Sequence, residues 1–298
     1  MKYHEPVLLE QSIDGLNIRP DGIYVDLTFG GGGHSREIIK NLTTGRLVGF
    51  DQDEDAESNA IRHERFIFIL GNFRYVKNYL RNEGIYEIDG ALADLGVSSH
   101  HFDVEERGFS FRFNSPLDMR MNKRAELTAK DILNTYSEDR LTRIFKEYGE
   151  LKNSEKLGAA IVQYRAQGFI ERVDDLLRAV DQCLPRQYQQ KYLAKVFQAL
   201  RIEVNDEIQA LAEMLVQITG LLRKGARFVV ITYHSLEDRL VKNLFRDGNI
   251  EGERKTDLYG APELVYRIVN RNIIRPNETE IEMNPRARSA KLRIAERI

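Results

Sequence analysis

The chain has 298 residues and 42% hydrophobic content, which excludes a protein that is disordered throughout and allows one large domain or two smaller ones. Its 44 Lys and Arg against 46 Asp and Glu give a net charge of -2, which excludes a generic polycation that coats nucleic acid. No apolar run reaches the ~18 residues of a membrane span, and no signal peptide is visible, so we expect no membrane association. Cys183 is the single cysteine, so we expect no intrachain disulfide and a reducing cytoplasm.

The first third of the chain predicts alternating strands and helices. Strands are expected at four short apolar runs, which are residues 23–27, 46–50, 66–69 and 88–93. Helical patterns are expected between them, at residues 34–42, 54–61 and 75–81. Strand and helix alternation with short connections is typical of a parallel, doubly wound sheet.

The middle of the chain shows a different pattern. Helices with no credible strand are expected from Thr128 onward, at residues 137–148, 154–167, 173–184 and 192–222. A strand at residues 227–232 and a helix at 236–245 then resume the alternation. We therefore predict an α/β, Rossmann-like sheet in two parts, residues 1–105 and 196–298 with a basic C-terminal tail, interrupted by an all-helical insertion at residues 106–195.

A glycine-rich turn follows the first predicted strand. Asp26 ends that strand, four glycines occupy residues 30–33, and Asp51 ends the next strand. Such a turn lets backbone N–H groups approach a ligand, and an acid after the second strand typically accepts hydrogen bonds from a ribose diol. The pattern predicts a cofactor that contains adenosine, either a dinucleotide or S-adenosylmethionine (SAM), whereas a tight turn with a helix-capping acid is the structural alternative.

The distribution of charge favours SAM. Residues 1–105 hold 10 basic and 18 acidic side chains, a net of -8, whereas residues 106–198 hold 17 and 13 and residues 199–298 hold 17 and 15, nets of +4 and +2. An acidic half suits a cationic sulfonium better than a pyrophosphate. The run of four glycines also departs from G-x-G-x-x-G, which weighs against an NAD-dependent oxidoreductase, the second hypothesis.

Seven ordered motifs carry a resemblance to a known family. They are DLTFGGGGHS at 26–35, DLGVSS at 94–99, ERGFSF at 106–111, PLDMRM at 116–121, FQALRIEVNDE at 197–207, HSLEDR at 234–239 and NPRARSAKLRIAER at 284–297. Together they make the chain similar to the bacterial small-subunit ribosomal RNA cytosine-N(4)-methyltransferase family, of the RsmH/MraW type. The resemblance implies a SAM-dependent enzyme that methylates the exocyclic amine of one cytidine in the decoding region of 16S rRNA, within a ribosomal particle.

The resemblance also implies which residues contact the cofactor. In this chain the positions that match the motifs are Gly32, Gly33, His34, Asp51, Phe73, Asp94 and His101. Asp51 is expected to bind the ribose, Phe73 to lie against the adenine, and Asp94 to lie near the methionine part of SAM. His101 stands where many relatives have glutamine.

The group that accepts the proton of the cytosine amine is not given by a known motif. Many amino-methyltransferases use Asp/Asn-Pro-Pro-aromatic at this point, whereas this chain has Asp94-Leu95-Gly96-Val97. The candidates are Asp94, Ser98 and His234, because each follows a predicted strand at the ligand edge of the sheet. No spacing among the six histidines predicts a metal site.

Basic residues outside the acidic half are the candidates for RNA contact. The predicted contacts are Arg107, Arg112, Arg120, Arg286 and Arg288. The phenylalanines at 109, 111 and 113 alternate with polar residues and could stack bases, although packing into a core is the favoured interpretation. A third hypothesis is a non-catalytic ribosome-assembly factor that retains a vestigial SAM fold.

Overall fold

The computed structural model describes residues 6–96, 105–254, 256 and 263–298. The chain divides into two compact units, the first formed by Met1–Gly96 with Ile208–Ile298 and the second by Val97–Glu207. The expected insertion, residues 106–195, lies wholly inside the second unit.

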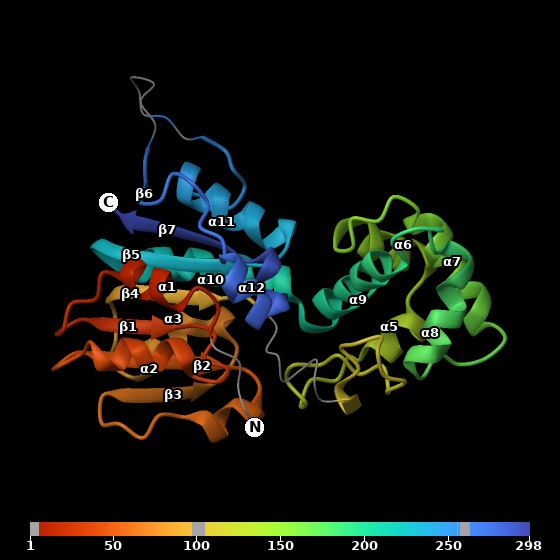
Figure 1. Cartoon of the computed structure of the whole chain (residues 1–298), viewed down its shortest axis with the longest axis horizontal. Coiled ribbons are helices and arrows are strands. Elements are labelled where there is room, and N and C mark those ends of the chain that lie inside the picture. The colour runs from red at the N-terminus through yellow and green to blue at the C-terminus, as the bar shows by residue number, and fades with distance from the viewer. Residues whose placement is uncertain (1–5, 97–104, 255, 257–262) are drawn as a thin grey trace. The chain divides into compact units, whose positions relative to one another are not determined.

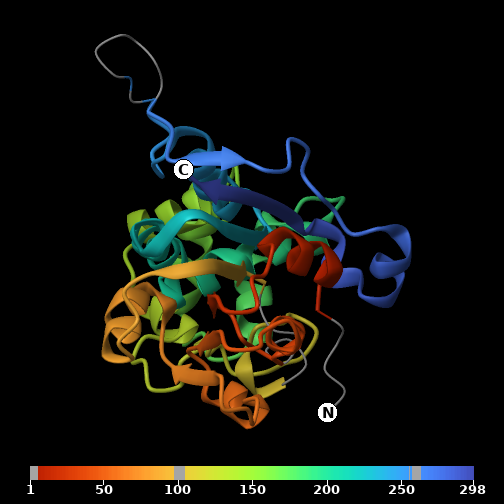
Figure 2. The same cartoon turned by 90° about the vertical axis from the view of Figure 1, so that its left-hand side faces the viewer.

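Within the described residues the first unit contains one seven-stranded sheet (Figure 1). Its strands are β1 Ile23–Asp26, β2 Arg46–Asp51, β3 Phe66–Leu70, β4 Ile88–Asp94, β5 Leu222–Thr232, β6 Tyr266–Ile268 and β7 Lys291–Arg297. The strand order is β3-β2-β1-β4-β5-β7-β6, and the sheet has the usual twist (Figure 2). This is a Rossmann-like α/β sheet, as the sequence predicts.

The sheet is mixed, and the parallel arrangement predicted from the first third of the chain is confirmed for β1 to β4. Strands β1 to β5 pair in parallel, but β7 runs antiparallel to both β5 and β6. The sequence of β7 alternates polar and apolar residues, so it lacks the continuous apolar run that marks the buried parallel strands. The segment expected as a basic tail therefore lies inside the sheet.

Helices cover both faces of this sheet. The helices that accompany the sheet are α1 Leu9–Leu16, α2 Gly33–Lys40, α3 Val76–Asn82, α10 Glu207–Leu221, α11 Ser235–Asp247 and α12 Glu278–Met283. No helix among the described residues is long and apolar enough to cross a membrane.

Strand β5 shows how the sheet separates two hydrophobic cores. Phe228 and Val230 belong to the cluster that contains residues of α3, α10 and α11, whereas Val229 and Ile231 belong to the cluster that contains residues of α1 and α2. Successive side chains of a strand point to opposite faces, so one buried strand supplies both cores. Each fully buried aliphatic or aromatic side chain contributes about 1.5–3 kcal/mol by removal from water.

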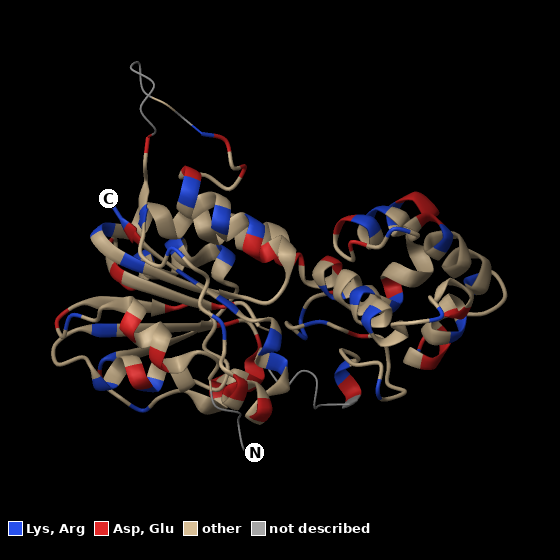
Figure 3. Cartoon of the chain, turned by 45° about the horizontal axis from the view of Figure 1, so that its top comes forward, with Lys and Arg blue, Asp and Glu red and all other residues tan. Residues whose placement is uncertain are grey.

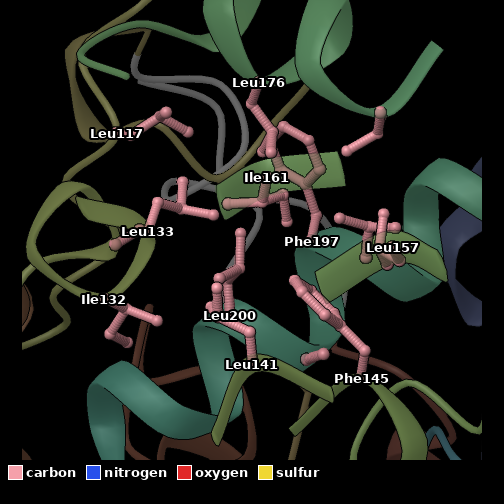
Figure 4. Packing of buried hydrophobic residues seen from close by; sticks show 14 of the residues in the cluster. Leu117, Ile132, Leu133, Leu141, Phe145, Leu157, Ile161, Leu176, Phe197 and Leu200 are labelled. Atoms are coloured by element: carbon pink, nitrogen blue, oxygen red, sulfur yellow. The ribbon is translucent and has the colours of Figure 1, made fainter. Parts of the chain in front are cut away.

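The second unit is helical and has its own core. Its helices are α5 Ala129–Thr135, α6 Glu138–Glu147, α7 Ser154–Arg165, α8 Val173–Val180 and α9 Gln189–Asn205. Phe145, Leu157, Phe197 and Leu200 are among the buried residues that meet between these helices (Figure 4). The hydroxyl of Ser137 accepts a hydrogen bond from the backbone N–H of Arg140 and so caps the start of α6.

The single helix expected at residues 192–222 is wrong, because the structure has two helices there. Asp206 adopts a left-handed conformation with φ 49°, which ends α9 before α10 begins. The preceding Asn205 is held by hydrogen bonds, accepting one from the N–H of Met121 and donating to the carbonyl of Met119. Apolar periodicity continues across the break, so the pattern alone does not reveal it.

Candidate functional site

Three aspartates mark the edge of the sheet where a ligand is expected. Asp26, Asp51 and Asp94 are the last residues of β1, β2 and β4. Since β1 pairs in parallel with both β2 and β4, the three carboxyl groups lie at the same edge. Ligands of open α/β sheets bind outside the carboxyl ends of the strands, so this edge is the candidate site.

The glycine loop between β1 and α2 leaves space at this edge. Gly30 has φ 51°, a left-handed conformation that favours glycine, and a Cβ placed there would meet no atom within 4 Å. Gly32 has φ 73°, and a Cβ there would lie 2.7 Å from the ring of Phe29. The loop therefore leaves space for a ligand beside Gly30 and is closely packed at Gly32. This is expected for a loop that binds a ligand with its backbone atoms.

Asp51 is bonded to that loop. One carboxylate oxygen of Asp51 accepts a hydrogen bond of 2.8 Å from the N–H of Gly30, and the other accepts one of 2.9 Å from the N–H of Asp53. A carboxylate has about four lone-pair sites and can therefore accept from several donors at once. Asp51 thus joins the end of β2 to the glycine loop, and its predicted role in ribose binding stays a prediction.

The side chain of His34 points into the protein. It is 5% exposed, and its Nε2 lies 3.1 Å from the carbonyl oxygen of Val7. Burial lowers the pKa of His34, which keeps the imidazole neutral. A contact between His34 and a cofactor would therefore use its backbone N–H in the first turn of α2, where N–H groups lack partners within the helix.

The pKa values of Asp94 and Asp26 are both raised by burial. For Asp94 burial raises the pKa to about 6, while the facing hydroxyl of Tyr233 and a hydrogen bond from the N–H of Gly96 act in the opposite direction. The backbone N–H of Asp94 also donates to the hydroxyl of Thr28, over 2.7 Å, next to the glycine loop. Asp94 can accept or release a proton near neutral pH, which suits a general base.

Glu237 holds the residues that follow β5. One oxygen of its buried carboxylate accepts hydrogen bonds from the N–H groups of Tyr233 and His234, over 2.8 and 3.3 Å. The other lies 2.9 Å from Nε2 of His234. Tyr233 and Glu237 are absent from the residues predicted from the sequence. The three-residue spacing between His234 and Glu237 at a predicted helix start was the available signal, because it is typical of a capping arrangement.

Three further residues predicted to bind the cofactor or to take part in catalysis are Phe73, Ser98 and His101. Phe73 follows β3 and packs, partly buried, against the core cluster that includes residues of β1 and β2. Ser98 and His101 lie outside the described residues. The predicted roles of these three residues stay predictions.

Two of the predicted RNA-binding arginines form bonds inside the second unit. Arg107 is 7% exposed, and its guanidinium donates hydrogen bonds to the carbonyls of Arg120 and Met121. Arg120 in turn donates two hydrogen bonds to the carboxylate of Asp118, over 2.8 and 2.7 Å. These bonds give both arginines a structural role, whereas Arg112 is exposed.

We expect Arg107→Met to destabilise the protein by about 1–3 kcal/mol, because the two carbonyls lose their buried donor. Thermal unfolding of the full chain, followed by circular dichroism, measures the loss. Arg112→Met is the matched control and should change stability by less than about 0.5 kcal/mol. Equal stability of the two variants would contradict the structural role of Arg107.

Two of the three phenylalanines beside these arginines, Phe109 and Phe111, pack inward, as favoured from the sequence, whereas Phe113 is exposed. Phe109 is 4% exposed, and the ring of Phe111 contacts that of Phe197 with centroids 5.6 Å apart. In the first unit, Arg286 is half-buried and Arg288 is exposed, both in the 3₁₀-helix Pro285–Ser289. Exposure therefore favours Arg112 and Arg288 among the predicted RNA contacts.

Comparison with known proteins identifies the family of this chain. The model of the MraW methylase family matches residues 1–298. A protein of Bacteroides thetaiotaomicron, named ribosomal RNA small subunit methyltransferase H, is 59% identical over 298 residues, which cover 100% of this chain and 98% of the relative. A protein of the same name from Flavobacterium johnsoniae is 52% identical over 299 residues, covering 100% and 99%. With a family match along the entire sequence and relatives this similar at full length, the chain belongs to the MraW methylase family.

Proposed function

We propose that this protein transfers a methyl group from SAM to the exocyclic N(4) amine of one cytidine in the decoding region of 16S rRNA. The observation that carries the proposal is the position of Asp94. Its carboxyl group lies at the end of β4, and its backbone N–H donates to the hydroxyl of Thr28 in the glycine loop. Membership of a methylase family supports the reaction class. The names of the relatives, ribosomal RNA small subunit methyltransferase H, support the substrate.

The donor set at the strand edge fits SAM. The open space at Gly30 would admit a ligand against the backbone of the loop. In this proposal the Asp51 carboxylate at the end of β2 binds the ribose diol, and the carboxylate of Asp94 suits a cationic amino acid or sulfonium. Gly32, Gly33 and the backbone of His34 complete the cradle in this proposal.

When bound, SAM supplies an electrophilic methyl carbon attached to a positively charged sulfur. The lone pair of the cytosine amine is delocalised into its ring, so the amine is a weak nucleophile and needs help from the protein. In our proposal the Asp94 carboxylate accepts a hydrogen bond from that amine and orients it. It then takes the proton that the nitrogen loses as the bond from nitrogen to the methyl carbon forms and the carbon–sulfur bond breaks, which would leave neutral S-adenosylhomocysteine. Ser98 and His234 remain the other candidate acceptors.

The RNA substrate is proposed to reach the site within a ribosomal particle in the cytoplasm. The target base must leave its stack to reach the strand edge, because its amine is otherwise covered by neighbouring bases. Exposed arginines on each unit supply contacts to phosphates, and Arg112 and Arg288 are the best placed of the predicted set. Acidic and basic residues alternate over the helices of the second unit, so local groups rather than a uniform field would make these contacts (Figure 3).

We expect Arg112→Ala and Arg288→Ala each to weaken methylation of the RNA by about tenfold at moderate salt while leaving SAM affinity unchanged. The measurement is KM for the RNA substrate at two salt concentrations, together with calorimetric SAM binding. Arg62→Ala, another exposed arginine of the first unit, is the control. A parallel loss of SAM affinity would contradict the separation between cofactor and RNA contacts.

One assay tests the proposed function against its competitors. The protein is incubated with methyl-labelled SAM and small subunits that lack the modification, and the label is mapped on the RNA. Label on a single cytidine amine supports the proposal. Absence of transfer with intact SAM binding favours a non-catalytic assembly factor, and binding of NAD in place of SAM favours the oxidoreductase.

A further inference from the structure

The ends of β4 and β5 bring a tyrosine to the Asp94 carboxyl group. The two strands pair in parallel with Asp94 opposite Ile231, and the N–H of Leu95 donates to the carbonyl of Ile231 over 3.0 Å. This pairing continues just past the strand, so Gly96 and Tyr233 meet beside Asp94. The hydroxyl of Tyr233 lies beside Gly96, 3.1 Å from where its Cβ would be, and faces the Asp94 carboxylate.

Gly96 provides the space that this arrangement needs. A Cβ at position 96 would lie 2.7 and 2.8 Å from ring atoms of Tyr233, closer than real carbon contacts allow. The N–H of Gly96 also donates to the Asp94 carboxylate over 3.3 Å. The ring therefore packs directly on the backbone at Gly96, which places its hydroxyl beside the carboxylate that accepts from Gly96.

The backbone of Tyr233 is also fixed by a hydrogen bond. Its backbone N–H donates to the buried carboxylate of Glu237 over 2.8 Å, at the start of α11. Its side chain packs against the core cluster that contains residues of α1 and α2. A ring fixed at its backbone and its face has little freedom, so its hydroxyl is directed at Asp94 without further ordering.

Among the described residues, the other charged groups that act on Asp94 or Tyr233 include three acids. Asp26 on β1 and Glu237 on α11 both face it, and Glu280 on α12 faces Tyr233. Each disfavours a negative charge on the carboxylate or phenol that it faces, as does burial. Among the described groups, the donors that favour the charged form of Asp94 are the hydroxyl of Tyr233 and the N–H of Gly96.

We propose that Tyr233 is a positioning residue, whose hydroxyl aims the Asp94 carboxylate through a hydrogen bond for which Gly96 leaves room. The proposal rests on the proposed function for the role of Asp94 in methyl transfer. Its structural part, the bond between Tyr233 and Asp94, is independent of that role. Loss of the hydroxyl removes a donor and adds no charge, so the carboxyl group should hold its proton to higher pH.

The first test is Tyr233→Phe, with the pKa of Asp94 followed by carbon NMR of its carboxyl in the full chain without SAM. We expect the pKa of Asp94 to rise by about one pH unit, the size expected for loss of one hydrogen bond to a charged group. Tyr86→Phe, an exposed tyrosine of the same unit, is the matched control and should leave it unchanged. An unchanged pKa in Tyr233→Phe would overturn the proposal.

The second test is the pH–rate profile of the same variants. The acid limb should move upward by about one pH unit in Tyr233→Phe, with a loss of about tenfold at pH 6 and recovery to near the wild-type rate by pH 8.5. Gly96→Ala, which displaces the ring, should show the same pH-dependent loss. A loss of equal size at every pH would indicate a merely structural role and overturn the proposal. If the wild-type protein transfers no methyl group, the proposed function fails, and the NMR titration still decides the bond to Tyr233.

Discussion

Asp94→Asn is expected to lower the rate of methyl transfer by about 10²–10⁴-fold, because the amide cannot accept the proton from the cytosine amine. The substitution keeps the shape of the side chain and retains one oxygen that can accept the hydrogen bond from Tyr233. Single-turnover methylation with saturating SAM measures the chemical step directly. An Asp94→Asn variant with full activity would remove Asp94 from the catalytic site.

The same substitution is expected to stabilise the fold. The pKa of Asp94 is raised from 3.8 to about 6, so its protonated form favours the folded state below pH 3.8, and that stabilisation is lost as the pH rises through 6. At pH 7 the buried carboxylate therefore costs about 1–3 kcal/mol, which the neutral amide avoids. Thermal unfolding of both proteins at pH 5 and pH 8 should show a larger gain at pH 8.

A second acid of the same strand is the matched control for Asp94. Asp89 is buried near the start of β4, where its carboxylate contacts Arg19 and Arg223 and accepts from the N–H of Ile23. Asp89→Asn should destabilise the protein, since these contacts weaken, and leave the chemical step intact. Opposite effects of two Asp→Asn changes on one strand separate a functional acid from a structural one.

Asp51→Asn should weaken SAM binding by about 10²-fold. The carboxylate accepts from the N–H groups of Gly30 and Asp53, and an amide can replace only one of its two acceptor oxygens. The variant therefore loosens the glycine loop and loses an acceptor for the ribose, each a hydrogen bond to a charged group worth about 1.5–3 kcal/mol. Titration calorimetry with S-adenosylhomocysteine, which cannot react, reports the affinity.

The control for Asp51 is Glu57→Gln. Glu57 is an exposed acid of the nearby 3₁₀-helix, Glu54–Asn59, so its substitution removes the same charge without touching the loop. Its effect on affinity should stay within about twofold, because solvent screens exposed charges. If both variants lost affinity equally, the field of the acidic half, rather than the bonds of Asp51, would explain the binding.

Strands β1, β2 and β4 were predictable from the sequence because most of their residues are apolar and buried, as in a parallel strand covered on both faces. Strand β3 lies at the edge of the sheet and is only partly buried, yet residues 66–69 are apolar at every position, so the same pattern predicted it. Strand β7 has Lys291, Arg293 and Arg297 among apolar residues, so its composition suggested a basic surface segment. Lys291 and Arg293 in fact pair with Asp238 of α11, a partner that becomes visible only in three dimensions.

Only those parts of the site that are formed by residues close together in the sequence were predictable. The glycine loop and the strand-end acids are short motifs, each specified by neighbouring residues, and the structure places Asp26, Asp51 and Asp94 at one edge. The contact between Gly96 and Tyr233 joins residues from two strands that are adjacent in space but far apart in sequence. Local patterns carry no information on such a pair. The inward direction of His34 likewise depends on Val7, which the helix pattern does not include.

The position of β7 has a consequence for how the chain folds during its synthesis. β5 pairs with β4 on one side and with β7 on the other, and β7 ends at Arg297. Until Arg297 has left the ribosome, one side of β5 exposes unpaired backbone groups, the kind of open strand that promotes association between chains. The helical unit is synthesised between β4 and β5, so its early collapse would shorten the effective separation of these two strands. Truncation after Ala290 should therefore leave an incomplete sheet that aggregates as it emerges.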